Sequence, residues 1–521
     1  MEKAIKTDVI IIGAGPTGLS LACQFIRYGI GFVIVDRKET ITPHSKAIGV
    51  QARTLEIYDQ INLAQDLIAQ GAIAAKVRMV VGGEVCGEVN FSELGKGLSP
   101  YPFVLIVEQG RHEKLLYDFI KANGKDVLWQ TELENLTQDE FGVKANVKNA
   151  NGENEKIEAR FLVGCDGAKS LVRHLLGLTF EGGTFERMYY VADVEIDWKF
   201  SHEAGHAFLM KNSVLAFFPM AGEKHWRIVG TFPEEFAKNE GEILYEEIEK
   251  RIKQDAELDL DITKVNWFST YKVHTRRANK FSEGRCFLAG DSAHIHTPAG
   301  AQGMNTGIQD GYNLAWKIVF VLKGKASAKI LETYNEERLE NAKNLLETTD
   351  RMFALAASSQ WFIAYLRTRV FPYLARLAFS IDAVKKFAFP RASQIGINYR
   401  HSSLSHHAGD GDFKVKAGDR MPYFLVDGKS IYDKLHQPKF HVLFFSTTQG
   451  DFQVLKADLE SQYAESVDVN AVPLHSQVAQ AFGPNSPFSM LLRPDNYIGF
   501  ISTETSLSNL RFYLNKIVGH S

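Results

Sequence analysis

Polar side chains that can do chemistry gather in one glycine-rich stretch, LAGDSAHIHTPAGAQGMNTGIQDG at residues 288–311. Asp291, His294 and His296 lie within six positions, and carboxylate and imidazole groups are ligands for divalent metal ions. No third ligand at helical spacing accompanies the two histidines, so a metal site is the weaker hypothesis. A glycine-rich turn before a helix instead predicts a backbone cradle for a larger ligand.

The elements that position this stretch are a strand and a helix. GRCFLAGD predicts a strand over 285–290 that ends at Asp291. Ligands of open parallel sheets bind outside the carboxyl ends of the strands, so Asp291 can accept hydrogen bonds from a ribose or a polyol. A helix is predicted from about Gly303, and its N-terminus directs the backbone N–H groups of 303–305 at the ligand. An anionic reduced flavin would be stabilised there.

The N-terminal segment DVIIIGAGPTGLSLACQFIRYGIGFVIVDR, residues 8–37, predicts a strand, a turn, a helix and a second strand. Its glycines have the spacing GxGxxG: Gly13, Gly15 and Gly18. They allow a tight turn, close approach of a pyrophosphate and close packing of helix on strand, respectively. Asp36 follows the second strand and can accept hydrogen bonds from an adenosine ribose. The segment predicts dinucleotide binding without separating NAD from FAD.

A third strand and helix are predicted over 159–177, ARFLVGCDGAKSLVRHLLG. Asp166 and Gly167 form the turn, and Ser170 can cap the helix. By itself this pattern is a common connection in α/β proteins.

Length and composition limit the remaining classes of function. A chain of 521 residues predicts two to four domains. The net charge is −3, so no basic surface for nucleic acid is expected. Four cysteines without a CxxC pair favour a reducing, cytoplasmic location. The uncharged stretch 9–26 is broken by GAGPTG, which favours a strand and a helix over an integral membrane segment.

Three motifs occur in order along the chain: GAGPTG, CDGAKSLVR and GRCFLAGDSAHIHTPAGAQGMN. With them the chain resembles the FAD-dependent aromatic hydroxylases, which are single-component flavoprotein monooxygenases similar to phenol hydroxylase and polyketide-tailoring hydroxylases. The resemblance covers about residues 5–345 and continues through AGDRMP and LLRPDNYIGF. It implies an α/β fold, with a Rossmann-like FAD-binding domain, an inserted β-rich substrate domain and a C-terminal thioredoxin-like domain.

The resemblance also implies domain boundaries. They are 1–180 with 281–345 for the FAD-binding domain, 181–280 for the substrate-binding sheet, 346–409 for a helical segment and linker, and 410–521 for the thioredoxin-like domain. The last domain has no cysteine and cannot perform dithiol chemistry. A structural or dimer-stabilising role is expected, and a homodimer is a family expectation only.

By motif, the resemblance implies that the following residues bind FAD: Gly13, Gly15, Gly18, Asp36, Arg37, Lys46, Arg53, Gln109, Asp166, Gly167, Asp291, Pro298, Gly303, Met304 and Asn305. Asp36 is expected at the adenosine ribose and Asp291 at the ribityl chain. Asp166 is expected near the pyrophosphate and the path of NAD(P)H. Lys46 replaces a common arginine, which retains the charge but loses the bidentate fork.

The implied reaction begins when NADPH or NADH reduces FAD. The reduced flavin traps O2 as a C4a-hydroperoxide and passes one oxygen atom to an electron-rich carbon of an aromatic substrate. Tyr271, in TYKVHTR, matches a pocket tyrosine of phenol hydroxylase and is the candidate catalytic residue. Ile48 stands where that enzyme has an aspartate, so a larger phenolic or polyketide-like substrate is expected rather than phenol.

Other functions remain open from the sequence. An antibiotic-inactivating monooxygenase of the tetracycline or rifamycin type fits the same motifs. A flavin reductase, dehydrogenase or halogenase of related fold is the next alternative. A NAD-dependent dehydrogenase or a module that holds FAD without turnover would lack the oxygen chemistry.

Overall fold

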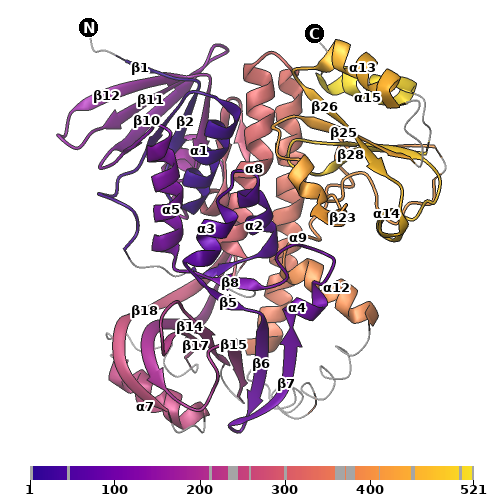
Figure 1. Cartoon of the computed structure of the whole chain (residues 1–521). Helices are drawn as coiled ribbons and strands as arrows, with labels where there is room; N and C mark the ends of the chain where they lie inside the picture. The colour runs from indigo at the N-terminus through magenta and orange to yellow at the C-terminus, as the bar shows by residue number, and fades with distance from the viewer. Residues whose placement is uncertain are drawn as a thin grey trace.

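The computed structural model describes residues 4–43, 47–210, 214–232, 245–256, 260–297, 302–357, 370, 382–409, 411–446, 452–503 and 507–518. Figure 1 shows three parts in contact: a central region that contains the N-terminal sheet, a large sheet below it, and a C-terminal domain beside helices α8 and α9. No helix within these ranges has the length and apolar character needed to cross a membrane.

A largely parallel sheet forms the centre of the N-terminal part. Its strands, in spatial order, are β19 (Ser282–Glu283), β20 (Cys286–Leu288), β13 (Phe161–Gly164), β2 (Val9–Ile12), β3 (Phe32–Val35) and β9 (Val127–Leu128). Strands β20, β13, β2 and β3 are parallel neighbours. Strands β2, β13 and β20 are buried along their whole length, and this explains their uninterrupted apolar sequences.

Helices and small sheets cover this central sheet. The helices are α1 (Pro16–Tyr28), α2 (Ala52–Asp59), α3 (Ala64–Ala69), α4 (Phe91–Leu94), α5 (Gln109–Ala122), α6 (Leu171–Leu175), α8 (Gly303–Leu322) and α9 (Glu332–Ala357). One small sheet contains β1 (Ile5–Lys6), β12 (Asn154–Ala159), β11 (Val143–Lys148) and β10 (Glu132–Gln138). The other contains β4 (Gly49–Val50), β8 (Val104–Ile106) and β5 (Ala72–Ala74). Helix α8 begins at Gly303, as the sequence predicts.

The large lower sheet is mostly antiparallel (Figure 1). Its strands are β21 (His294–Ile295), β18 (Asp261–Ala278), β14 (Phe180–Asp197), β17 (His225–Thr231), β16 (Val214–Pro219), β15 (Ala204–Leu209), β6 (Lys76–Val81) and β7 (Glu84–Asn90). Helix α7 (Tyr245–Ala256) contributes Ile248 and Ile252 to the core on one face. The sheet extends beyond the predicted range 181–280, because β6 pairs with β15 and β21 pairs with β18.

The C-terminal domain is built on a mixed sheet. Its strands are β22 (His406–Ala408), β28 (Ile498–Ser502), β27 (Phe488–Leu492), β25 (Phe440–Ser446) and β26 (Val467–Pro473). A hairpin joins β23 (Leu425–Val426) to β24 (Lys429–Ser430), and the helices are α13 (Phe452–Tyr463), α14 (Ser476–Phe482) and α15 (Leu507–Val518). The strand predicted at 440–446 is β25, and it lies inside the sheet.

The segment before this domain is more ordered than its linker-like composition indicates. Helix α12 spans Asp382–Ala392 and contains Pro390. Ile395, Tyr399 and Leu404, which follow it, are buried. This segment therefore packs against the body of the protein through these side chains and Phe389, whereas Phe387 of α12 stays exposed.

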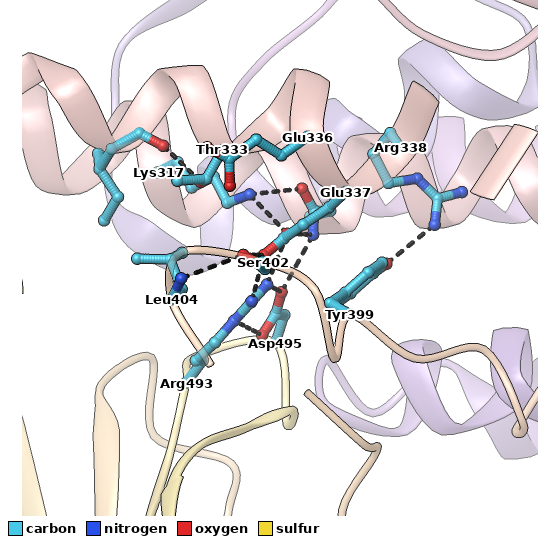
Figure 2. A network of polar contacts seen from close by, with 12 residues as sticks. Lys317, Thr333, Glu336, Glu337, Arg338, Tyr399, Ser402, Leu404, Arg493 and Asp495 are labelled. Carbon is cyan, nitrogen blue, oxygen red and sulfur yellow. Dashed lines mark hydrogen bonds and ion pairs between the residues drawn. The ribbon is translucent and has the colours of Figure 1, made fainter. Parts of the chain in front are cut away.

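A buried ionic cluster joins the C-terminal domain to α8 and α9 (Figure 2). Arg493 donates to both carboxylate oxygens of Glu337, at 2.5 and 3.0 Å, and also to Asp495. Lys317 of α8 donates to Glu337 at 2.7 Å. These four side chains are at most 1% exposed. Because separating the two parts would leave Glu337 without the guanidinium group that pairs with it, the cluster couples the C-terminal domain to α8 and α9.

Candidate active site

The predicted motifs converge at one edge of the central sheet. The strand order places β20, β13, β2 and β3 side by side and parallel, so their carboxyl ends lie together. The residues just after these strands are Asp291, Asp166, Gly13 and Asp36. We call this the carboxyl edge. Ligands of open α/β sheets bind at such an edge.

The three glycines of the first turn have different surroundings. Gly13 has a φ of 105°, and a Cβ there would lie 2.3 Å from the carbonyl oxygen of Cys165. A Cβ on Gly18 would lie 1.9 Å from the carbonyl oxygen of Gly13. A Cβ on Gly15 would have no described atom within 4 Å. Gly13 and Gly18 therefore allow the turn to pack, whereas Gly15 leaves open space at the N-terminus of α1.

Asp36 directly follows β3 and contacts the same turn from the other side. Its carboxylate accepts hydrogen bonds from the backbone N–H groups of Ala14 at 2.7 Å and Lys38 at 2.8 Å. Arg37 is exposed, and its guanidinium group lies 3.9 Å from Glu132. Gln109 begins α5 and donates to Glu113 at 2.8 Å. Each oxygen of Asp36 accepts one of the two backbone hydrogen bonds and can accept a further one.

The turn after β13 carries a carboxylate with unused hydrogen-bonding capacity. Oδ2 of Asp166 accepts from the backbone N–H of Val172, while Oδ1 is buried without a partner among the described residues. Burial raises the pKa of Asp166. Ser170 caps α6 through the N–H of Arg173, as predicted. Gly167 has a φ of 81° and no described atom within 4 Å of a Cβ position.

Asp291 lies in a short 3-10 turn, η2 (Gly290–Ser292). Gly290 and Ser292 are buried, but the side chain of Asp291 is exposed. Surrounding protein nevertheless desolvates the carboxylate and raises its pKa. Because the carboxylate is accessible to solvent and yet desolvated by its surroundings, we infer that it lies in a recess, which would suit a polyol or ribose ligand.

The N-terminus of α8 borders this recess. No side chain caps it, and its first turn has no acidic residue. Gly303 and Met304 are partly exposed. Asn305 is buried, and its amide bonds the backbone of Gly49 and Gln51. The helix dipole therefore favours an anion beside Gly303.

Two polar atoms beside α8 have no protein partner among the described residues: Nε2 of His296 and Oγ1 of Thr297. A Cβ on Gly303 would lie 3.5 Å from that His296 nitrogen. Burial lowers the pKa of His296 to about 4, so the imidazole is neutral at physiological pH. Together with the open space at Gly15 and the free oxygen of Asp166, these atoms fit a long polar ligand such as FAD.

Three of the residues predicted to contact FAD are Lys46, Pro298 and Arg53. Lys46 and Pro298 lie outside the described residues. Arg53 is 1% exposed and bonds Glu56 and the carbonyl oxygen of Asp495, next to the C-terminal domain. The structure therefore accounts for Arg53 as an interface residue, and its contact with a cofactor stays a prediction.

The large sheet presents one face to the central region. Phe218 and Met220 of this face pack on Ile48, Ala74 and Ile106. Residues directly opposite one another in an antiparallel pair share a face. Since Phe218 pairs with Arg227, that arginine belongs to the same face. We call this the inner face.

Arg227 forms a buried ion pair on the inner face. Its guanidinium group donates to both oxygens of Asp193, with an Nη2–Oδ2 distance of 2.7 Å. Its Nη1 has no partner among the described residues. A guanidinium group held by one carboxylate keeps N–H donors for a second acceptor.

Tyr271 lies on the inner face as well, because it is four residues from Trp267, the partner of Asp193. It is half-buried, and its ring centroid is 5.9 Å from that of Tyr189. Burial raises the pKa of Tyr271 to about 12, although the charge of Arg227 opposes this shift. The phenol is therefore a hydrogen-bond donor at physiological pH.

His294 and His296, which the sequence offered as metal ligands, make separate contacts. His294 is buried and bonded through Nε2 to Asp310 at 2.7 Å, whereas His296 bonds the carbonyl oxygen of Thr297. Within the described ranges, no group of three or more His, Cys, Asp or Glu side chains is arranged to hold a metal ion.

Sequence reasoning missed Asp310 and the Arg227–Asp193 pair. Asp310 lies on α8 two turns after Gly303, so helical spacing alone could have placed it on the same side as the cradle. The partner of Arg227 is 34 positions away, on another strand, and no local pattern identifies it.

Comparisons with known proteins agree with this geometry. The family described as FAD binding domain matches residues 6–349. A flavin-dependent monooxygenase of Mycobacteroides abscessus is 32% identical, covering 98% of this chain and 100% of its own. The 6-methylpretetramide 4-monooxygenase of Streptomyces rimosus is 29% identical, covering 95% and 91%. The solved anhydrotetracycline hydroxylase of Streptomyces rimosus has a TM-score of 0.77 at 26% identity, with 99% of each chain covered.

Proposed function

The chain belongs to the FAD binding domain family and is a flavin-dependent monooxygenase, and from this premise we propose that it hydroxylates a phenolic or polyketide-like aromatic compound with NAD(P)H and O2. Its cofactor is FAD. The observation that carries the proposal is the carboxyl edge, where a glycine turn, three carboxylates and an uncapped helix N-terminus lie together.

FAD, when bound, supplies the reaction with O2 and with hydride from NAD(P)H. The residues of this chain hold and orient it. The open space at Gly15 and the N-terminus of α1 suit the pyrophosphate. Asp36 suits the adenosine ribose, and Asp291 suits the ribityl chain. The N-terminus of α8, with Gly303 and Met304, supports negative charge on the flavin ring.

The inner face of the large sheet is the proposed substrate surface. Phe218 and Met220 supply apolar contact beside Ile48. Tyr271 is protonated and can donate a hydrogen bond to a substrate oxygen. An apolar wall with a few oriented donors suits a polycyclic aromatic compound that carries phenol or ketone oxygens. The isoleucine at position 48 leaves no carboxylate there to deprotonate a simple phenol.

The similar proteins support the substrate class. Two of them are named for tetracycline-type polyketides, a 6-methylpretetramide and an anhydrotetracycline. Both cover more than nine-tenths of the chain, so the similarity includes the large sheet as well as the FAD-binding part.

The decisive experiment supplies the holoprotein with NADPH and ¹⁸O2 and a panel of polycyclic phenols that includes anhydrotetracycline. We expect one product 18 mass units heavier than its parent, which is the parent plus one ¹⁸O atom. NADPH oxidation that yields only hydrogen peroxide with every compound would instead identify a flavin oxidase or reductase. Replacing Asp291 with Asn provides the control, since it should lower product formation in parallel with FAD binding.

We also propose a fold and a role for the C-terminal domain, and a location for the protein. The C-terminal domain has a mixed sheet flanked by helices, which supports a thioredoxin-like fold. It has no cysteine, so it would serve structure or dimerisation. The four cysteines are free thiols, which supports a cytoplasmic location.

A further inference from the structure

The turn that carries Asp291 is held by its backbone. The N–H of Gly290 donates to Asp310 at 2.9 Å, and the carbonyl oxygen of Ser292 accepts from Arg173 at 2.8 Å. The hydroxyl of Ser292 lies 2.5 Å from the carbonyl oxygen of Gly164. These contacts fix the residues on both sides of Asp291 and leave its carboxylate facing the recess.

Asp310 is the ionised group among these supports. It is fully buried, and its Oδ2 accepts from Gly290 and from Nε2 of His294, while its Oδ1 accepts from Nε of Arg338 at 2.6 Å. Burial alone would raise the pKa of Asp310, but Arg338, His294 and the Gly290 N–H outweigh burial and lower it. The carboxylate is therefore charged when it holds the turn.

Arg338 connects this carboxylate to the C-terminal part of the chain. Its Nη1 donates to the hydroxyl of Tyr399 at 2.9 Å, and its Nη2 donates to the carbonyl oxygen of Thr306 at 3.2 Å. Figure 2 shows Tyr399 and Arg338 pointing toward one another. The ring of Tyr399 packs on Tyr497, with centroids 4.4 Å apart. A continuous set of buried contacts thus runs from the C-terminal domain to the Asp291 turn.

We propose that Asp310 is a positioning residue for the cofactor: through Gly290 it sets the place of the Asp291 carboxylate, and through Arg338 and Tyr399 it makes FAD affinity depend on the segment that leads into the C-terminal domain. This inference rests on the proposed function, because it takes Asp291 as a ligand of FAD. It explains why a carboxylate that touches no part of the recess is buried with full ionic pairing.

An amide cannot replace this carboxylate. Both oxygens of Asp310 accept hydrogen bonds. Oδ2 accepts from the backbone N–H of Gly290, and Oδ1 accepts from Nε of Arg338. In Asp310→Asn, either orientation of the amide puts its NH2 group against one of these donors. The repulsion either displaces Gly290 or breaks the contact with Arg338, and both changes move the turn.

The test compares Asp310→Asn with a matched control, Glu337→Gln. Glu337 is an equally buried carboxylate on α9 that pairs with Arg493, but it makes no contact with the Asp291 turn. Full-length proteins are stripped of cofactor, FAD is titrated by flavin fluorescence, and the visible spectrum and midpoint potential of each holoprotein are measured. Thermal unfolding of the apoproteins reports the purely structural cost of each change.

We expect both variants to unfold at lower temperature, but only Asp310→Asn to lose FAD affinity, by about tenfold to a hundredfold. Its flavin absorbance bands and midpoint potential should also change. FAD affinity and spectrum equal to wild type in Asp310→Asn would overturn the inference. So would an equal loss in Glu337→Gln, since the effect would then be general destabilisation. Failure of the wild type itself to bind FAD would overturn the proposed function.

Tyr399→Phe keeps the inference testable if Asp310→Asn does not fold. It removes one oxygen that accepts from Arg338 and leaves the ring packing on Tyr497 in place. We expect a smaller loss of FAD affinity, of about threefold to tenfold, with the same direction of spectral change. Unchanged affinity and spectrum in this variant would overturn the part of the inference that involves the C-terminal segment.

Discussion

The three glycines of the GxGxxG motif have different structural reasons for being glycine. Gly13 and Gly18 are required by the protein itself, because a Cβ on either would meet a neighbouring carbonyl group. Gly15 has open space around it, and no described neighbour requires a glycine there. We therefore expect Gly13 and Gly18 to serve folding and Gly15 to serve cofactor binding.

Alanine at two of these glycines should give opposite results. Gly18→Ala should lower the stability of the apoprotein by about 1–3 kcal/mol, because the methyl group overlaps Gly13. Gly15→Ala should leave stability unchanged and weaken FAD binding. Chemical unfolding and FAD titration of both proteins provide the measurement. A stable Gly18→Ala protein, or a Gly15→Ala protein with full FAD affinity, would contradict the argument.

Tyr271 allows a second test at this scale. Tyr271→Phe should lower kcat/KM about tenfold, because the protonated hydroxyl no longer donates to the substrate. Tyr190→Phe is the control, since Tyr190 packs in the core on the opposite face of the same sheet. Steady-state kinetics with the identified substrate decide the matter. Equal kinetics in both variants would remove Tyr271 from the substrate surface.

At the scale of elements, helices α1 and α8 pack closely against each other. Gly307 of α8 lies against Thr17, where a Cβ would be 2.4 Å from the threonine hydroxyl. Gly311, one turn later, lies against Leu21 with a Cβ distance of 3.3 Å. Small residues at four-residue spacing thus bring the N-terminal halves of the two helices close together.

The two α8 glycines should differ in their tolerance of alanine. Gly307→Ala should cost about 1–3 kcal/mol of stability and weaken FAD binding, because the methyl group forces α8 away from α1. Gly311→Ala should be milder, since its neighbour needs to move by only a few tenths of an ångström. Thermal unfolding and FAD titration compare them. A reversed order would show that the helix spacing is not limiting at Gly307.

We expect the packing of α5 on α2 to make the stability of the protein depend on pH. His112 is fully buried and bonds the hydroxyl of Tyr58 at 2.7 Å. Burial lowers the pKa of His112 to about 4, so between pH 6.5 and 4 the unfolded chain binds a proton that the folded protein does not. Stability should fall over this interval as the pH falls, by up to about 3 kcal/mol from this residue.

Urea unfolding of wild type and His112→Gln at pH 7 and pH 4.5 tests this dependence. The variant should lose part of the pH dependence, while His296 keeps contributing in the same direction because its pKa is also lowered to about 4. If the free energy of unfolding changes equally between pH 7 and pH 4.5 in the two proteins, His112 does not control stability in acid.

At the scale of the whole molecule, the C-terminal domain is an integral part of the FAD-binding body. Arg493 is held by Glu337 of α9 and by Asp495, and Arg53 of α2 donates to the backbone of Asp495. When charges are buried this completely, removing one partner of a pair strongly destabilises the folded protein. The domains should consequently unfold together.

Arg493→Met should lower the free energy of unfolding by about 3–5 kcal/mol, because Glu337 and Asp495 would be left buried without their cation. The control is Arg400→Met, whose pair with Asp419 is exposed and should be worth less than about 1 kcal/mol. Calorimetry measures both, and wild type should show a single transition. Two well-separated transitions in wild type would contradict the coupling of the domains.

Local sequence was sufficient to predict the elements at the carboxyl edge. Strands β2 and β3 and the start of α8 lie where hydrophobic runs and glycines placed them, and Ser170 caps α6. It gave no sign that Arg53, which the motif assigns to FAD, also donates to the carbonyl oxygen of Asp495 in the C-terminal domain. It also missed β6 and β7, which join a sheet built mainly from residues more than 100 positions later.

The sequence by itself determined the chemistry of this protein, because glycine turns, apolar strands and the acids that follow them are local patterns whose spacing the cofactor dictates. Only the tertiary structure decided which strands lie side by side, which face of the large sheet meets the central region, and which buried charges are paired. These depend on contacts between residues far apart in the chain, such as Asp310 with Arg338 and Glu337 with Arg493. The residues around one member of such a pair do not indicate which distant residue will pair with it.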